Sequence, residues 1–357
     1  GALMVLSQLC LPDRVDEAVP LMEQAVEAAQ SAEHRTLALQ ALAQIHEIRG
    51  DLAGFARTAE AALSESRRAA NRRLEIPVRQ QCAWAWALLD RAADASREAQ
   101  VLLDDSLVRA QKPRLAMVHL LAGFAALHAG DLRRALPETA AAWETLGAGG
   151  SPKLRATVLR HLLDALLDLE AWPAVREYGA GLAVAAEPGE PSALLAEKRA
   201  AALVAQAKAG AAEALSILEP HAALARAHTD LLDAARYVHH LGVAYLARAS
   251  GGGVESGGGA FVAPRAAARL AAAHRAAEHF EEAHARLGTI GYGYYRARAL
   301  LGLARSFFAA GDGERAWAAL ERSITLARGI GSRGVLADAL RLRVETRLGE
   351  SGEHPGA

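Results

Sequence analysis

A Gly-Asp pair recurs along this chain, each time between two stretches in which apolar residues have helical spacing. It occurs in "IRGDLAGFARTAEAAL" at 48–63, in "HAGDLRRAL" at 128–136 and in "AAGDGERAWAAL" at 309–320. A glycine in the left-handed conformation ends a helix, and an aspartate after it can accept hydrogen bonds from the first N–H groups of the next helix. Each pair therefore predicts the end of one helix and the start of another.

The breaks between helices recur at a step of 40 residues. They lie near residues 11, 50, 90, 130, 170, 210 and 250, and the step then lengthens once, by 21 residues, to the Gly-Asp pair at 311–312. The longer step contains "SGGGVESGGGAFVAP", and this composition predicts a flexible glycine-rich insertion at 250–264 in place of a short turn. Two helices of about 15 to 20 residues fit between successive breaks, and no run of alternating β-branched residues predicts a strand.

A single pair of helices of this size cannot bury its apolar face, so consecutive pairs must stack on one another. The second helix of each pair, here called helix B, carries an alanine early in its sequence, as at Ala18, Ala135 and Ala316. Such a small side chain lets helix B approach the first helix of the pair, helix A, closely. The sequence predicts an all-α, right-handed α-solenoid of seven to eight helix-turn-helix repeats over residues 1–349, with a disordered tail at 350–357.

The last unit resembles a tetratricopeptide repeat. In "LLGLARSFFAAGDGERAWAALERSITLARGIGSR", at 300–333, the family's positions are matched by the residues Ala304, Phe307, Gly311, Ala316 and Leu320. The family repeat has about 34 residues, and the longer step found here is similar to repeats in the sensor regions of MalT-like transcriptional activators and STAND-type signalling ATPases. A HEAT array, with a period of about 40 to 47 residues, is the alternative, and the Gly-Asp turns favour the tetratricopeptide interpretation.

The resemblance implies a binding or sensor module, part of a larger bacterial signalling or transcriptional regulator, that holds a protein or peptide partner on its concave face. The alternative that it implies is a domain that senses a small-molecule inducer. The chain has neither the P-loop nor the helix-turn-helix of such regulators, so we expect no cofactor and no direct contact with nucleic acid from this segment.

Composition restricts the function further. The 40 basic and 41 acidic residues give a net charge of −1, which provides no overall attraction to nucleic acid or to an anionic membrane. Two cysteines, Cys10 and Cys82, cannot form a disulfide framework, and we expect a reducing, cytoplasmic setting. No charge-free apolar run reaches the ~18 residues that a membrane-spanning helix requires.

Residues of the types used in catalysis do not form a known catalytic motif. His274, His279 and His284 follow one another at five-residue steps, so they cannot share one face of a helix, and we predict a solvated helix face without metal. Cys82 lies in the apolar run "QQCAWAWALL", where a thiol is more often packing than a nucleophile. We therefore expect a non-enzyme, with His284 and Cys82 as the residues on which an enzymatic alternative would depend.

Binding residues are expected where helix A of each unit faces inward. Aligning each helix A on its turn gives one set of inward side chains: Gln40, Gln44, Glu47, Gln80, Trp84, Phe124, Arg160, Asp164, Arg236, His239, Arg298 and Arg305. The C-terminal members of the set are more basic than the N-terminal ones, which would suit an acidic peptide segment or an anionic metabolite.

Overall fold

The structure is a computed structural model that describes residues 15–146, 191–228, 230–251 and 262–352, with residues 155, 158, 159, 162, 163 and 166 between them. The described part of the chain is helical and contains no strand. Its helices are α2 (Val15–Glu27), α3 (Ala32–Ile48), α4 (Leu52–Arg68), α5 (Arg72–Leu88), α6 (Ala92–Leu103), α7 (Ser106–Arg109), α8 (Lys112–His128), α9 (Leu132–Leu146), α12 (Pro191–Ala209), α13 (Ala211–Leu218), η2 (Glu219–His221), α14 (Ala222–Ala227), α15 (Leu231–Ala249), α16 (Val262–Ile290), α17 (Gly293–Ala310), α18 (Gly313–Gly329) and α19 (Arg333–Gly352).

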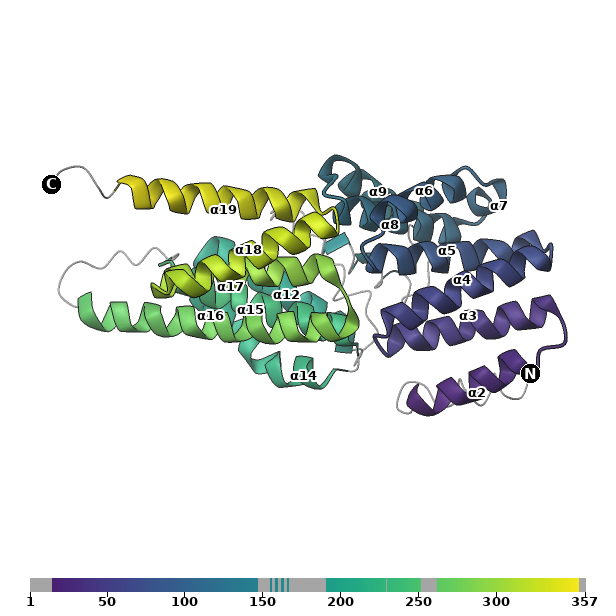
Figure 1. Cartoon of the computed structure of the whole chain (residues 1–357), viewed down its shortest axis with the longest axis horizontal. Helices are drawn as coiled ribbons and strands as arrows, with labels where there is room; N and C mark the ends of the chain where they lie inside the picture. Colours follow the sequence, from purple (N-terminus) through teal and green to yellow (C-terminus); the bar gives the residue numbers. More distant parts are fainter. Residues whose placement is uncertain are drawn as a thin grey trace.

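Consecutive helices pack as antiparallel A–B pairs, such as α3 with α4, α8 with α9 and α17 with α18 (Figure 1). The prediction of an all-α solenoid of helical repeats is confirmed. The three Gly-Asp turns have the predicted geometry, since φ is +71° at Gly50, +74° at Gly130 and +79° at Gly311. The aspartate after each glycine accepts a hydrogen bond from the backbone N–H three residues later, at 2.8, 3.3 and 3.1 Å in chain order.

Small residues allow helix A and helix B to touch. Ala18, Ala135 and Ala316, the early alanines of three B helices, are all 0% exposed. At Gly302 in α17 the helix lies so close to its neighbour that an added Cβ would be 2.4 Å from the ring of Phe280 in α16. The close approach predicted from the small residues is therefore present.

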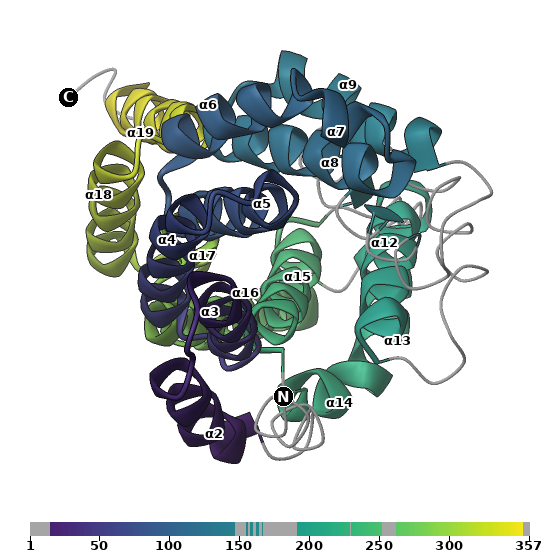
Figure 2. The ribbon, with the colours of Figure 1, turned by 90° about the vertical axis from the view of Figure 1, so that its right-hand side faces the viewer.

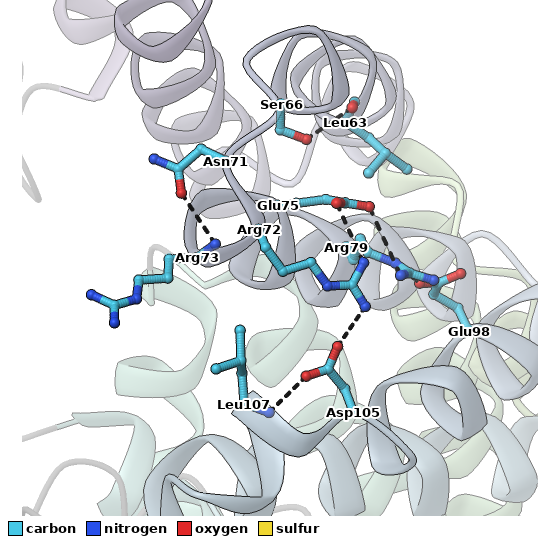
Figure 3. A network of polar contacts seen from close by, with 10 residues as sticks. All are labelled: Leu63, Ser66, Asn71, Arg72, Arg73, Glu75, Arg79, Glu98, Asp105 and Leu107. Carbon is cyan, nitrogen blue, oxygen red and sulfur yellow. Dashed lines mark hydrogen bonds and ion pairs between the residues drawn. The ribbon is translucent and has the colours of Figure 1, made fainter.

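Polar contacts tie adjacent units together in the N-terminal part of the array (Figure 3). Arg72 at the start of α5 donates to the carboxylate of Asp105 at 2.5 Å, and Asp105 also accepts from the backbone N–H of Leu107 at 2.8 Å. Further along α5, Arg79 pairs with Glu98 of α6, and both side chains are mostly buried. These contacts hold α5 against α6 and α7, which keeps the inward face of α5 in a fixed orientation.

The array curves so that its N-terminal and C-terminal groups of helices meet. Helices α2–α9 and helices α15–α19 lie end to end along the molecule, with α12–α14 completing the path between them (Figures 1 and 2). Turns of the first group abut helix ends of the second: a Cβ on Gly50 would be 2.8 Å from Ile290, and one on Gly130 would be 2.6 Å from the backbone N of Gly334. We call this junction between α2–α9 and α15–α19 the seam.

Some sequence expectations differ from the structure or lie outside the described residues. His279 is only 9% exposed and stacks on Tyr245 at 5.3 Å, so the prediction of a solvated face is wrong for this histidine, which packs against α15. Helix α16 begins at Val262, within the predicted glycine-rich loop, and α19 extends to Gly352, within the predicted tail. The rest of that loop, the residues after 352, and the predicted binding residues Arg160 and Asp164 lie outside the described residues.

Among the residues that the structure describes, no helix is both long enough and apolar enough to span a membrane.

Candidate functional site

A cavity of about 440 Å³ opens on the inner face of the array, and we call it the first cavity. Its walls come mainly from the A helices α3 and α5 and from the start of α15. Helix α4 adds Leu52 and Phe55, α8 adds Met117, and Ile290 of α16 adds a contact from across the seam. The first cavity is thus built by residues from both groups of helices, and it exists only while the seam is closed.

Half of the predicted inward residues line this cavity. They are Gln40, Gln44, Glu47, Gln80, Trp84 and Arg236. The first two lie four residues apart on α3, as do Gln80 and Trp84 on α5, so each pair occupies one face of its helix. The structure therefore brings these six residues, from α3, α5 and α15, to one cavity.

Amide side chains dominate the polar part of the wall, and one of them was missed by the sequence analysis. Gln81 lines the cavity beside Gln80, and its Nε2 donates to the backbone carbonyl oxygen of Gln40 at 3.1 Å, while its Oε1 is buried without a hydrogen-bond partner. Its neighbour Gln80 was selected because it falls on the inward register of helix A. Gln81 reaches the cavity because α3 lies directly beside α5, a relationship between two repeats that a single-helix register does not show.

The charged residues of the first cavity are mostly acidic. Glu47, Asp230 and Asp233 line it together with one basic residue, Arg236. Arg236 lies 3.6 Å from Asp233, and their side chains are 1% and 3% exposed, so the two charges largely neutralise each other in a buried pair. The described wall of the first cavity thus includes three carboxylates and one guanidinium.

Phe124 differs from its predicted role. It is 5% exposed and lines neither this cavity nor the one described next, so it does not face a partner directly. Its ring stacks under Trp84, with 4.8 Å between ring centroids, and it contacts His128 at 4.1 Å on its other side. Phe124 therefore supports the Trp84 wall of the cavity from beneath.

The aromatic stack continues across the seam. His128 at the end of α8 has one ring nitrogen 3.0 Å from the carbonyl oxygen of Ala87 and the other 2.5 Å from the hydroxyl of Tyr292. Burial lowers the pKa of His128 to about 3, so the ring stays neutral and can donate through Nδ1 while it accepts from Tyr292. This bond joins α8 to the residue that precedes α17.

Asp90 makes the most direct connection across the seam. It occupies the turn between α5 and α6, where the glycine of other repeats would lie, and its φ is +61°. Its two carboxylate oxygens accept from the backbone N–H groups of Gly293 and Tyr294 at 3.0 and 3.1 Å. Asp90 therefore accepts from the first N–H groups of α17, whose N-cap residue is Tyr292, although that helix begins about 200 residues later in the chain.

A second cavity, of about 280 Å³, lies on the other side of the aromatic stack. Three predicted inward residues line it: His239, Arg298 and Arg305. Its walls come from α12, α15, α16 and α17, and the ends of α8 and α19 close it at the seam. The predicted binding residues are thus divided between an acidic first cavity and a second cavity with two arginines.

Cys82 and His284 are the residues on which an enzymatic alternative would depend, and each has a defined environment in the structure. Burial, with smaller effects from Glu60 and Glu98, raises the pKa of the Cys82 thiol to about 12, so it is a poor nucleophile. His284 is half-buried, and its ring lies 3.1 Å from a guanidinium nitrogen of Arg322. In the described ranges, no group of three or more histidine, cysteine or acidic residues is placed to hold a metal ion.

Comparison with known proteins bears on the fold. No protein-family model matches the chain, and no curated protein matches it. Among solved structures, the chain is similar to a Rap protein complexed with Competence and Sporulation Factor, at 12% identity and a TM-score of 0.57, with 88% of each chain covered.

Two further solved structures align less well. BtubC (BKLC) from P. vanneervenii aligns at 16% identity over 76% of this chain and 93% of its own, with a TM-score of 0.38. Yeast Tom70 aligns at 13% identity over 97% and 96%, with a TM-score of 0.26. The likeness to the Rap protein shows a shared helical-repeat fold, and the other two alignments carry no argument.

Proposed function

We propose that this protein is a binding module that holds an extended segment of a partner protein, or a free peptide, in the first cavity. The observation that carries the proposal is the convergence of inward side chains from α3, α5 and α15 on one cavity of about 440 Å³. This volume lies within the range of about 300 to 1,000 Å³ that is typical of ligand pockets. The Rap protein that shares the fold was solved as a complex with Competence and Sporulation Factor, which supports a binding role.

The chemistry of the wall supports a peptide. Gln40, Gln44, Gln80 and Gln81 each carry one carbonyl acceptor and an NH₂ donor, the same pair of groups that a peptide backbone presents. Glutamines spaced four residues apart on adjacent helices can therefore pair with successive peptide groups of an extended chain, while Trp84 offers an aromatic surface for a side chain.

The charge of the wall selects among peptides. Since the described wall carries three acidic side chains and one basic side chain, a segment with a lysine or arginine suits the first cavity better than an acidic one. This differs from the acidic segment that the sequence suggested, because Arg298 and Arg305 line the second cavity and Arg236 of the first cavity lies beside Asp233. We place the module in a bacterial signalling or transcriptional regulator, on the resemblance of its long repeats to MalT-like and STAND proteins.

Two matched libraries of fluorescein-labelled hexapeptides test the proposal, one with a fixed central lysine and one with a fixed central glutamate. Fluorescence anisotropy should show binding from the lysine library, with little from the glutamate library. Gln44→Ala and Gln80→Ala should each weaken the best peptide about tenfold, since each removes two hydrogen bonds to the ligand.

Gln100→Ala is the matched control, because Gln100 is an exposed glutamine on helix B of its unit, α6. It should leave the affinity unchanged. If both libraries fail to bind, or if Gln100→Ala weakens binding as much as Gln44→Ala does, the first cavity is not the binding site.

A further inference from the structure

A group of basic side chains lies outside both cavities, where α16, α17 and α18 meet. It consists of His284 on α16, Arg296 on α17 and Arg322 on α18, and none of the three lines the first or the second cavity. Helices α16 and α18 are successive B helices, and α17 packs against both of them (Figure 1). We call these three residues the basic cluster.

Two contacts place the basic cluster on one face of α16. Nη2 of Arg322 donates to Nε2 of His284 at 3.1 Å. One turn further along α16, a Cβ added to Gly288 would be 3.7 Å from Nε of Arg296, so the glycine leaves room for that guanidinium. Residues 284 and 288 are four positions apart and share a helix face, so both arginines lie over the same part of α16.

The ring of His284 is neutral at pH 7, and its contact with Arg322 determines where its proton lies. Burial is the main cause that lowers the pKa of His284, the charges of Arg296 and Arg322 lower it further, and a backbone group of Arg296 offsets part of this. A guanidinium can only donate, so Nε2 of the ring accepts and the proton of the ring is on Nδ1.

Two donors of the basic cluster therefore lack an acceptor. Nδ1 of His284 and Nε of Arg296 are both buried without a hydrogen-bond partner. A buried donor without an acceptor is unfavourable and uncommon in folded proteins. A bound group that supplies acceptor oxygens would satisfy the cluster, whereas a donor would not.

The basic cluster also carries an excess of positive charge. Helix α17 contains no acidic residue. The acidic residues that neighbour the cluster on α16 and α18 have basic partners of their own: Glu281 with Arg315 at 3.1 Å, Glu282 with Arg226 at 2.9 Å and Glu321 with Arg343 at 3.4 Å. Within the part of the chain that the structure describes, no carboxylate pairs with Arg296 or Arg322, so the missing acceptor is favoured to be an anion.

We propose that the basic cluster binds a phosphate monoester. Such a group carries a charge of about −1.5 to −2 at pH 7 and three strong acceptor oxygens. Donors from three helices match the three oxygens, and two guanidiniums match a charge close to −2. A carboxylate, with two oxygens and one negative charge, matches the cluster less completely.

The position of the basic cluster allows two sources of this group. Arg322 is exposed, so a phosphate that is attached to a larger molecule can reach it. A phosphorylated side chain of a protein segment and a small phosphorylated metabolite share the same chemistry. Because the cluster is separate from both cavities, binding here neither requires nor excludes a peptide in the first cavity.

Isothermal titration calorimetry with the full chain tests the proposal. The probes are a capped alanine–phosphoserine–alanine peptide, the same peptide with serine or glutamate at its centre, and glycerol 3-phosphate. We expect at least one phosphate probe to bind 1:1, at least ten times more tightly than the serine and glutamate peptides. Tighter binding of the phosphopeptide would indicate a protein source, and tighter binding of glycerol 3-phosphate would indicate a metabolite.

Substitutions test whether the basic cluster is the site. Arg296→Gln and Arg322→Gln should each weaken the phosphate probe at least tenfold, and Arg322→Lys, which keeps the charge, should weaken it less. Arg328→Gln is the matched control, since it removes an exposed arginine of the same helix that points to another side, and it should not change the affinity. Because Arg322 is exposed, Arg322→Gln remains a fair test even if Arg296→Gln, at a half-buried position, perturbs the fold.

Two results would overturn the proposal. One is that no phosphate probe binds more tightly than the glutamate peptide, and the other is that Arg322→Gln and Arg328→Gln have equal effects. Gln44→Ala, which alters the first cavity, should leave binding of the phosphate probe unchanged. Failure here and failure of the proposed peptide site are therefore distinguishable.

Discussion

Replacing Asp90 with alanine should open the seam. The substitution leaves the backbone N–H groups of Gly293 and Tyr294 without the carboxylate that they contact at 3.0 and 3.1 Å. Loss of an exposed N-cap costs about 1 kcal/mol, whereas a buried N–H that loses its partner costs about 1–3 kcal/mol. Since Gly293 and Tyr294 are both buried, we expect a loss of about 2–4 kcal/mol, concentrated at the seam.

Related substitutions at Asp90 should follow a fixed order. Asp90→Gly removes the same acceptor, but glycine adopts the +61° φ of this turn without strain, so its cost should be about 1 kcal/mol smaller than that of alanine. Asp90→Asn keeps one carbonyl acceptor and tolerates the left-handed conformation, so it should cost least. The expected order of destabilisation is alanine, then glycine, then asparagine.

Hydrogen–deuterium exchange with mass spectrometry measures the effect directly. A loss of 2–4 kcal/mol corresponds to exchange that is about 30 to 1,000 times faster. In Asp90→Ala the increase should include the segment 330–336, which meets Gly130 at the far end of the seam. Asp312→Ala is the control, because Asp312 caps α18 within its own repeat and should affect the start of that helix alone. Faster exchange restricted to residues 293–294 in Asp90→Ala would refute the idea that Asp90 holds the two groups of helices together.

Three further predictions follow from particular contacts. Gly302→Ala places a Cβ 2.4 Å from the Phe280 ring and should lower stability by about 1–3 kcal/mol in thermal unfolding, whereas Gly313→Ala, which has open space, should not. Because burial raises the pKa of Cys82 to about 12 from 9.0, iodoacetamide at pH 8 should modify it about a thousandfold more slowly in the native protein than in guanidinium chloride, and equal rates would contradict this. Burial and, to a smaller extent, Arg199 lower the pKa of His239 from 6.5 to about 4, so the protein should lose stability as pH falls from about 6.5 to 4. In His239→Gln the midpoint of urea unfolding should depend less on pH over that range.

The sequence predicted the helices and their turns because those depend on local chemistry. The Gly-Asp pairs at 50–51, 130–131 and 311–312 end one helix and cap the next with residues no more than three positions away. The early alanines of helix B predicted close packing for the same reason. Aligning A helices on these turns was enough to identify six residues of the first cavity.

The seam could not be predicted from the sequence, because it depends on how far the array rotates and rises with each repeat. Asp90 illustrates this, since the sequence at 90–91 shows a turn without glycine, and nothing local indicates that its side chain accepts from the start of α17. The same curvature divides the inward residues between two cavities. Phe124 stacks beneath Trp84. The sequence did not predict this, because the register of a helix gives the direction of a side chain but not its depth in the fold.

Photocrosslinking tests the central claim most directly. The tightest lysine-library peptide, carrying a benzophenone group, is irradiated with the protein, and the crosslinked residues are mapped by mass spectrometry. We predict crosslinks within 40–47 of α3 and 77–84 of α5, and a loss of crosslinking in Gln44→Ala. Crosslinks confined to the B helices α4 and α6, or unchanged in Gln44→Ala, would contradict binding in the first cavity.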